Sequence, residues 1–305
     1  MELRHLRCFL ALAEELHFGR AAEKVHVDQS PFSRTIKELE EELGAQLFTR
    51  NTRNTQLTLA GKSFQERVPR IFAALDQARD GVQSAANGFH GQLRIALSDC
   101  ITPSRLSTLL AQCRDEDPEI EVRLFEVPLS QQLKGLHDDL YDVGFSMVGA
   151  VGDGIVAIPA WQDELMVVMH SRHPLLDYRR VPLEKVLEQR LVLGDPATCL
   201  GYTQQVDHFL QKRDEELLIR QRVASFDAMM VLVSAGLAVG FAGAAHIAFN
   251  REPGVKGRQL AGAPHMLTTY LLRRDAEPSP MLVRFMERVV KLDASGVESA
   301  ADESQ

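Results

Sequence analysis

The sequence predicts a multidomain α+β protein in which a small helical domain, a long helix and a two-part α/β region follow one another. Three observations predict this order. Apolar residues recur at helical spacing as far as Leu43, a 3.5-residue repeat runs from Phe64 to Ala85, and strands alternate with helices from Gln92 onward. A length of 305 residues and a hydrophobic fraction of 45% suit a chain with two or three compact units.

Three short helices are predicted at the start of the chain. The first runs from Leu3 to Leu16, and two more flank His26 and Val27. The apolar faces of these two helices are Phe18, Ala21, Ala22 and Val25, then Phe32, Ile36, Leu39 and Leu43. Asp28 stands where it can cap the third helix, and Gly44 stands where that helix should end. Together they predict a helix-turn-helix.

The polar face of the third helix is suited to a DNA major groove. The candidate contact residues are Gln29 at the tip, Ser30, Arg34 and Lys37 opposite the apolar face, Ser33 on its flank and Pro31 in the first turn. Arginine or lysine can pair with phosphates or guanine, and glutamine with an adenine edge. The alternative is an ordinary pair of packed helices with a solvated polar face.

A wing is predicted directly after these helices. The segment QLFTRNTRNTQLTL, residues 46–59, reads as two short strands around a polar tip that carries Arg50 and Arg53. Both side chains are candidate phosphate or minor-groove contacts, and a solvated hairpin tip is the alternative. Residues 1–62 hold nine Lys or Arg and nine Asp or Glu, so the remaining 243 residues carry the net charge of −8. The overall acidity therefore does not exclude a nucleic-acid partner.

The helix that follows is predicted to pair with a second copy of the chain. Its seam consists of Phe64, Val68, Ile71, Leu75, Ala78, Val82 and Ala85. A seam at alternating four- and three-residue spacing is narrow, as in a coiled coil. Pro69 lies within it and predicts a local bend, and Asn87 and Gly88 end the helix.

Two alternating blocks of strands and helices are predicted after the long helix. The first is βαβαβ: strand 93–97, helix 106–113, strand 120–124, helix 133–140 and strand 143–147. The second has strands at 164–169, 191–193 and 218–224 and helices at 183–189, 203–213 and 229–239, before a strand at 268–272 and a last helix at 280–292. Parallel sheets with helices on both faces are expected, in two lobes. The small, acidic tail 293–305 is expected to be flexible.

Several classes of function find no support in the sequence. It has none of the common nucleophile, phosphate-binding or zinc-protease motifs, and its four cysteines are scattered without metal-ligand spacing. We therefore expect no catalytic residue, metal or cofactor. No apolar run is long enough to span a membrane, and Glu14 and Glu15 interrupt what would be a signal peptide, so a cytoplasmic protein is predicted.

The first sixty residues resemble the DNA-binding domain of the LysR-type transcriptional regulators. The shared pattern includes the paired alanines of the second helix, Q-S-P-x-S-R and I-K-x-L-E-x-x-L-G-x-x-L-F-x-R in and after the third, and L-T-x-A-G before the long helix. The resemblance implies a winged helix-turn-helix over 1–58, a linker helix over 59–88 and an effector domain over 89–292 with the two-lobed fold of periplasmic solute-binding proteins. Lobe I would be about 89–161 with 266–292, and lobe II about 162–265.

The resemblance also implies partners and DNA contacts. It implies promoter DNA, a small-molecule coinducer between the lobes, a homodimer or homotetramer through linker helix and effector domains, and contact with RNA polymerase. Gln29, Ser30, Pro31, Ser33, Arg34 and Arg53 occupy the family's DNA-contacting positions. The family more often places its proline one residue before Pro31. The competing classes are an enzyme or an α/β ligand-binding protein with an appended helical interaction domain.

Candidate effector contacts follow from the rule that parallel sheets bind ligands at the carboxyl ends of their strands. They are Ser98, Cys100, Thr102, Leu129, Ser130, Asp195 and Thr198, and Phe226 is a separate candidate for the wall of the cleft. Thr102 also suits a helix cap, the serines and Thr198 suit solvated loops, and Phe226 suits a core. Cys100 and Cys199 could form a thiol switch across the cleft if their side chains were close enough.

Overall fold

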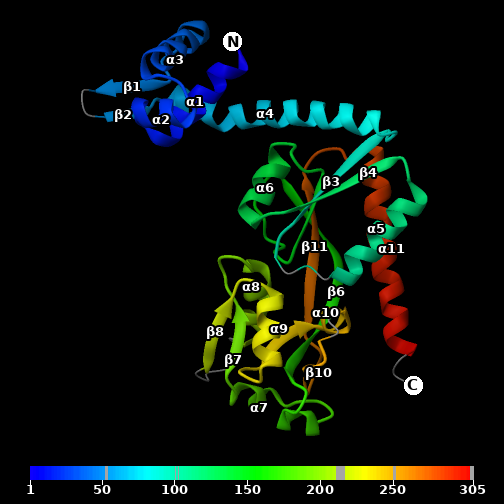
Figure 1. The fold of residues 1–305 in the computed structure, drawn as a ribbon. Coiled ribbons are helices and arrows are strands. Elements are labelled where there is room, and N and C mark those ends of the chain that lie inside the picture. Colours follow the sequence, from blue (N-terminus) through cyan, green and yellow to red (C-terminus); the bar gives the residue numbers. More distant parts are fainter. Residues whose placement is uncertain (52–53, 100, 102, 211–216, 250–251, 303–305) are drawn as a thin grey trace. The chain divides into compact units, whose positions relative to one another are not determined.

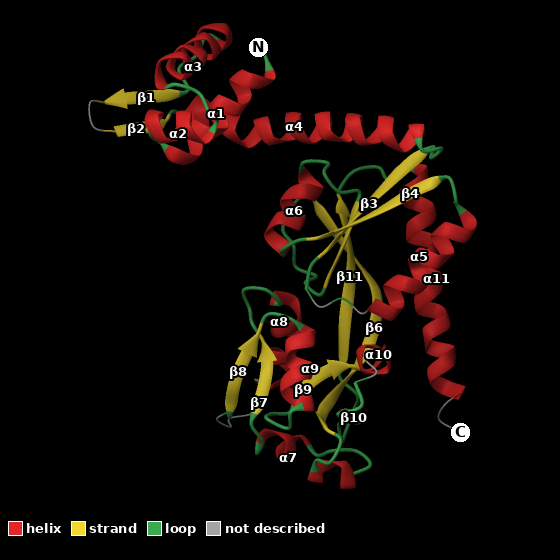
Figure 2. Ribbon diagram, viewed as in Figure 1, coloured by secondary structure: helices red, strands yellow, loops and turns green. Residues whose placement is uncertain are grey.

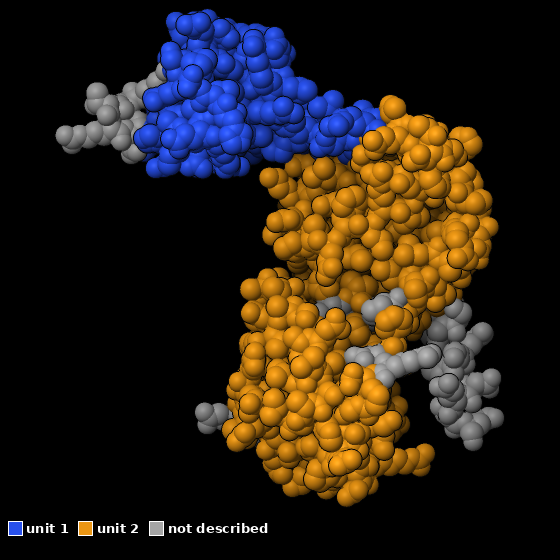
Figure 3. Space-filling view, in the orientation of Figure 1, with its two compact units in different colours: residues 1–79 blue, residues 80–305 orange. Residues whose placement is uncertain are grey.

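A computed structural model describes residues 1–51, 54–99, 101, 103–210, 217–249 and 252–302. The chain divides into two compact units, residues 1–79 and 80–305, which Figure 3 shows in blue and orange. The division falls inside the long helix, between the predicted boundaries at residues 58 and 88. Each unit is described below on its own.

Unit 1 contains the three predicted helices and the wing (Figure 1). The elements are α1 Leu3–Glu15, α2 Phe18–Lys24, α3 Gln29–Leu43, β1 Phe48–Asn51 and β2 Asn54–Leu57, followed by α4 Leu59–Ala86. Phe9, Phe32, Ile36 and Leu39 are completely buried in one shared core. The apolar spacing thus predicted the helices and most of the faces that they bury, but Leu43, predicted on the buried face of the third helix, is 39% exposed at the end of α3.

The ends of the helices agree only in part with the prediction. Gly44 ends α3 in the left-handed region with φ 64°, as expected for a C-terminal glycine. Asp28 is the N-cap residue of α3, but its side chain makes no capping hydrogen bond. The capping side chain in this hairpin is instead His17, which accepts a hydrogen bond from the backbone N–H of Arg20 at the start of α2.

The long helix α4 has one end in the core of unit 1 and an apolar seam beyond it. Phe64 and Val68 pack against the core of unit 1, and Pro69 lies inside the helix. Further along, Ile71 is 38% exposed and Val82 is 71% exposed in the single chain. Two large apolar side chains of the predicted seam are therefore available to a partner helix.

Unit 2 contains nine named strands and seven α-helices within the residues that the structure describes (Figure 2). The strands are β3 Gly91–Leu97, β4 Ile120–Glu126, β5 Val143–Ser146, β6 Ile155–His170, β7 Leu191–Gly194, β8 Ile219–Val223, β9 Gly240–Gly243, β10 Val255–Gln259 and β11 Met266–Arg274. The helices are α5 Pro103–Glu116, α6 Leu129–His137, α7 Leu183–Leu187, α8 Leu200–Leu210, α9 Phe226–Ser234, α10 Ala244–Phe249 and α11 Pro280–Asp302.

The large sheet of unit 2 is mixed, which corrects the expectation of parallel sheets. Its order is β10-β6-β11-β5-β3-β4, with β9 also paired to β6. Only β3 is parallel to its neighbours β4 and β5, whereas β6 and β11 pair antiparallel. The separate pair β7 and β8 is parallel. The βαβαβ block was therefore predicted correctly, but the strands that complete its sheet, β11, β6, β10 and β9, join it through antiparallel pairs.

Strand β6 begins at Ile155, nine residues before the strand that the sequence predicts at 164. Pro159 lies in its first half, and the pairing with β11 shifts by one residue between Thr269 and Tyr270. A proline and a bulge interrupt the regular alternation by which a strand is recognised. The helix expected to end at Leu292 also continues, because α11 extends to Asp302. Most of the segment predicted as a flexible tail is thus helical.

Two hydrophobic cores divide unit 2 into lobes (Figure 1). The core of lobe I contains Trp161 and Leu271, and that of lobe II contains Leu165 and Leu267. Strands β6 and β11 therefore pass from one lobe into the other. In lobe I, α5 and α11 cover one face of the sheet, and α6 packs on a smaller cluster with Leu136, Ile155 and Leu272 on the other.

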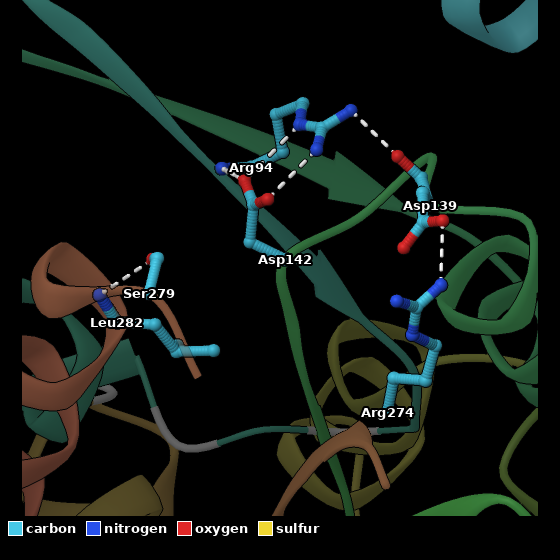
Figure 4. A network of polar contacts seen from close by, with 6 residues as sticks. All are labelled: Arg94, Asp139, Asp142, Arg274, Ser279 and Leu282. Atoms are coloured by element: carbon cyan, nitrogen blue, oxygen red, sulfur yellow. Dashed lines mark hydrogen bonds and ion pairs between the residues drawn. The ribbon is translucent and has the colours of Figure 1, made fainter. Parts of the chain in front are cut away.

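A polar network holds the outer end of lobe I (Figure 4). The Arg94 guanidinium donates to both carboxylate oxygens of Asp142, at 3.0 and 2.7 Å, and to the carbonyl oxygen of Asp139 at 2.8 Å. Arg274 pairs with the Asp139 carboxylate at 2.6 Å. The bidentate pair joins β3 to the residue just before β5 and so fixes these two neighbouring strands to each other. Among the described residues, no helix is both long and apolar enough to cross a bilayer.

Candidate functional site

The outer face of α3 is the candidate DNA-reading surface. Its inner face is fixed, because Phe32, Ile36 and Leu39 are fully buried and the Phe32 ring meets Phe18 edge-on at 6.1 Å. The predicted contact residues Gln29, Ser30, Pro31, Arg34 and Lys37 are exposed, and Ser33 is half-buried. Because one face of α3 is buried in the core, the residues on its opposite face are held toward solvent.

Arg34 and Lys37 differ in how they are held. Arg34 forms no hydrogen bond or ion pair with any described residue, so its guanidinium is free to bind a phosphate or a guanine. Lys37 lies 3.4 Å from Glu41 one turn later, and both side chains are more than half exposed. An exposed pair of this kind contributes little and leaves the ammonium available.

Residues that sequence reasoning passed over hold the wing against α3. The Glu40 carboxylate accepts hydrogen bonds from the backbone N–H groups of Leu47 and Phe48, at 2.8 and 3.1 Å. The Thr58 hydroxyl donates to the Gln46 carbonyl at 2.7 Å. A Cβ on Gly61 would collide with the Leu47 carbonyl oxygen. Glu40, Leu47, Phe48, Thr58 and Gly61 are all letters of the motifs quoted above, and in the fold they position the wing.

The predicted wing contacts are only partly visible. Arg50 lies in β1, where its backbone pairs with Thr55, and nothing is described of its side chain. Arg53 lies outside the described residues. Their contacts with DNA stay predictions.

A cleft of about 580 Å³ lies between the two lobes of unit 2. Lobe I contributes the segments that follow β3 and β4, including Ser98 and Pro128. Lobe II contributes the segments that follow β7 and β8, including Thr198 and Phe226. All four are carboxyl ends of parallel strands, which is where α/β sheets bind ligands. The volume is that of a small-molecule site.

Three of the predicted effector residues line this cleft and three do not. Ser98, Thr198 and Phe226 are lining residues, whereas Leu129, Ser130 and Asp195 are not among them. Leu129 starts α6 and packs on the cluster beneath it. Asp195 instead accepts a hydrogen bond from the backbone N–H of Ala197 at 2.9 Å. Cys100 and Thr102 lie outside the described residues.

The hydroxyl of Ser98 is already engaged. It donates to the side-chain oxygen of Gln132 at 2.9 Å, and the Gln132 amide donates in turn to the carbonyls of Ala96 and Phe145. Both side chains are buried. Ser98 therefore supports the cleft wall, and its remaining contribution to a ligand is that of an acceptor.

Phe226 forms an aromatic wall together with His246, which sequence reasoning did not find. The two rings stack with centroids 4.0 Å apart, and Tyr202 meets Phe226 edge-on at 6.3 Å. Burial lowers the pKa of His246 to about 4, while the nearby Asp227 acts in the opposite direction. The imidazole is consequently neutral at pH 7.

Asp99 links the lobes across the cleft. One of its carboxylate oxygens accepts from the Ser146 hydroxyl at 2.7 Å and the Met147 N–H at 3.2 Å. The other accepts from the Gly201 N–H at 2.8 Å, in the first turn of α8 of lobe II. Asp99 adopts φ 61°, a left-handed conformation that aspartate tolerates better than most residues.

The predicted thiol switch has one described member. Cys199 is buried, and its thiol donates to the Ala224 carbonyl at 3.3 Å. Since Cys100 lies outside the described residues, the distance between the two thiols is not described and the switch stays a prediction.

A helix-turn-helix head joined to a two-lobed domain with a ligand-sized cleft defines a ligand-responsive DNA-binding regulator. Comparison with known families identifies which one. Residues 3–62 match the bacterial regulatory helix-turn-helix protein, lysR family, and residues 86–293 match the LysR substrate binding domain. The chain belongs to the LysR family of transcriptional regulators.

Individual relatives agree with this membership. The chain is 31% identical to the uncharacterized HTH-type transcriptional regulator YnfL of Escherichia coli K12, over 78% of this chain and 81% of that protein. It is 28% identical to the regulator AlsR of Bacillus subtilis, over 79% and 80%. Among solved structures, full-length CbnR complexed with its target DNA matches 96% of this chain and all of CbnR, with a TM-score of 0.71 and 27% identity.

Proposed function

We propose that this regulator binds promoter DNA through the outer face of α3 and the wing, and that a small molecule in the interlobe cleft controls the response. The exposed and unpaired Arg34, on a helix whose opposite face is fully buried, carries the DNA-binding part of the proposal. The residues assigned to DNA are Gln29, Ser30, Pro31, Ser33, Arg34, Lys37, Arg50 and Arg53. In lobe I the effector contact assigned is Ser98, and in lobe II they are Thr198 and Phe226.

Dimerisation through α4 supplies the geometry that the proposal needs. The exposed seam residues Ile71 and Val82 gain burial only against a second helix. Two paired heads would then read two half-sites, as in other helix-turn-helix dimers. Effector binding shifts the closure of the lobes, and the linker helix passes that change to the angle between the paired heads. The angle in turn alters the bend of the DNA and the recruitment of RNA polymerase.

We also infer that the protein acts in the cytoplasm and has no catalytic role of its own. The named relatives are transcriptional regulators, and the DNA on which such a protein acts lies in that compartment. If the chain were an enzyme, or a ligand-binding protein with an appended interaction domain, the exposed polar face of α3 would have no assigned function.

The Arg34→Ala variant tests the DNA-binding proposal. Loss of one well-placed guanidinium contact in each half-site should weaken operator binding by about 1–3 kcal/mol per half-site, and the dependence on salt should fall by about one counterion per half-site. Arg4→Ala is the matched control, because Arg4 is an exposed arginine of α1 that pairs with Glu2. Fluorescence anisotropy over a salt series measures both quantities, and gel filtration verifies that the oligomer is intact. Equal affinity and equal salt slope for Arg34→Ala and the native chain would remove Arg34 from the interface.

A further inference from the structure

The charges in the interlobe cleft restrict the kind of molecule that fits it. Three carboxylates line the cleft among the described residues, namely Asp99, Glu126 and Asp227, and no lysine or arginine does so. The neutral His246 adds no positive charge. Glu126 and Asp227 are exposed to the solvent of the cleft, and a concave site lined by charges of one sign repels anions and attracts cations.

Two of these carboxylates are free. Glu126, at the end of β4 in lobe I, and Asp227, in the first turn of α9 in lobe II, form no hydrogen bond or ion pair with another described residue. They come from opposite lobes. A cation between them would therefore favour the closed arrangement of the lobes.

At the N-termini of α8 and α9, side chains of the protein already accept hydrogen bonds from backbone N–H groups. A helix N-terminus binds anions through its free N–H groups. In α8 the Gly201 N–H donates to Asp99, and in α9 the Ala228 N–H donates to the Ser225 hydroxyl. The protein's own carboxylate thus stands where the carboxylate of a ligand would bind at α8.

Part of the remaining lining is apolar. Phe226, Ile101 and Leu106 give the cleft an aromatic and aliphatic wall. Apolar area of this kind favours a ligand with a hydrocarbon or aromatic portion.

We propose that the effector is a small organic cation, an ammonium or amidinium group on an apolar body, held between Glu126 and Asp227 with its apolar part against Phe226. This inference rests on the proposed effector role of the cleft. Beyond that role, the inference specifies the charge of the ligand and the two side chains that select for this charge.

Three probes that share a phenyl group on a two-carbon chain and differ in charge test the proposal on the full-length chain. They are phenethylamine, 2-phenylethanol and 3-phenylpropionate, titrated at constant ionic strength in a calorimeter. We expect the amine to bind tightest, at least about tenfold tighter than the carboxylate, which is 1.4 kcal/mol. Glu126→Gln combined with Asp227→Asn should reduce amine binding about tenfold or more, with the alcohol affected little.

Glu277→Gln is the matched control, because Glu277 is an exposed carboxylate that does not line the cleft. Its binding of the amine should equal that of the native chain. The proposal is overturned if the carboxylate binds as well as the amine, if amine binding survives the double substitution, or if no amine binding occurs at millimolar concentration. Operator binding measured on the same preparation separates the two proposals. Retained operator binding with the wrong charge preference refutes only the cation, whereas loss of operator binding by the native chain refutes the regulator function.

Discussion

The Asp99 carboxylate should contribute strongly to the stability of unit 2, because it joins both lobes through three hydrogen bonds. Hydrogen bonds to charged groups contribute about 1.5–3 kcal/mol each, but those of one carboxylate are not additive. Alanine removes all three and also tolerates the φ of 61° less well than aspartate. We expect Asp99→Ala to lower the free energy of unfolding of unit 2 by about 3–5 kcal/mol.

Asp99→Asn separates the two halves of this contribution. Asparagine keeps the tolerance for the left-handed conformation and one acceptor oxygen, but its amide nitrogen cannot accept a hydrogen bond. If its oxygen faces Ser146 and Met147, its nitrogen faces the Gly201 N–H, and the bond between the lobes is lost. We expect about 1–2 kcal/mol of destabilisation. The exchange of the Gly201 amide with deuterium should become faster.

The single tryptophan makes the measurement specific. Trp161 is completely buried in the core of lobe I, so its fluorescence during urea unfolding reports on unit 2. Hydrogen exchange followed by mass spectrometry measures the peptide that contains Gly201. Native-like unfolding of Asp99→Ala, together with unchanged exchange at Gly201, would show that this carboxylate does not join the lobes.

Two further predictions concern the wing and the outer helices of lobe I. Gly61→Ala should weaken operator binding about tenfold or more, since the new Cβ would collide with the Leu47 carbonyl and displace the wing; an anisotropy titration measures it. Arg288→Met should destabilise unit 2 by about 2 kcal/mol at pH 7, because buried Arg288 pairs with Asp117 and lowers the pKa of that carboxyl. A carboxyl whose pKa is lowered in the folded state stabilises the fold at pH values above its ordinary pKa, and this contribution is lost as the pH falls through the lowered value. The difference in unfolding free energy between Arg288→Met and the native chain should therefore shrink in acid. Urea unfolding at several pH values measures it.

Matched controls exist for both variants. Gly81→Ala lies on the same helix as Gly61, with open space around its Cβ, and should leave operator binding unchanged. Arg284→Met removes a 46% exposed arginine that contacts Asp117 at 3.4 Å, and should cost much less than Arg288→Met. Equal operator binding by both glycine variants would contradict the wing argument. A stability difference that does not depend on pH would contradict the role of Asp117.

The helical head could be predicted because its signals are local. Helical spacing of the apolar residues sets the inner face of α3, and the exposure of Arg34 follows from the opposite side of the same helix. The contacts that position the wing are less local. Glu40 meets Leu47 across the turn after α3, and the sequence shows only that a carboxylate is present. Which backbone N–H groups it accepts from depends on how the chain turns.

The position of the cleft at the strand ends could be predicted, but the residues that line it could be predicted only in part. The rule for strand ends selected Ser98 and Thr198 correctly as lining residues, and Phe226, which was expected separately as a cleft wall, also lines it. It extended too far after β4, which ends at Glu126, because Leu129 already begins α6. Asp99 and Gly201 are 102 positions apart, so no local pattern relates them. Contacts between distant segments come from tertiary packing, which spacing within one segment does not report.

The charge of the cleft likewise cannot be inferred from the net charge of the whole chain. The chain as a whole carries −8, yet residues 1–62 are neutral and present the unpaired Arg34 outward. In the cleft, Glu126 and Asp227 gather negative charge from segments about a hundred positions apart, and neither belongs to an acidic run in the sequence. A ligand responds to the charges within a Debye length of its binding position and not to the sum over the chain. The same net charge is therefore compatible with an anionic partner at α3 and a cationic one between the lobes.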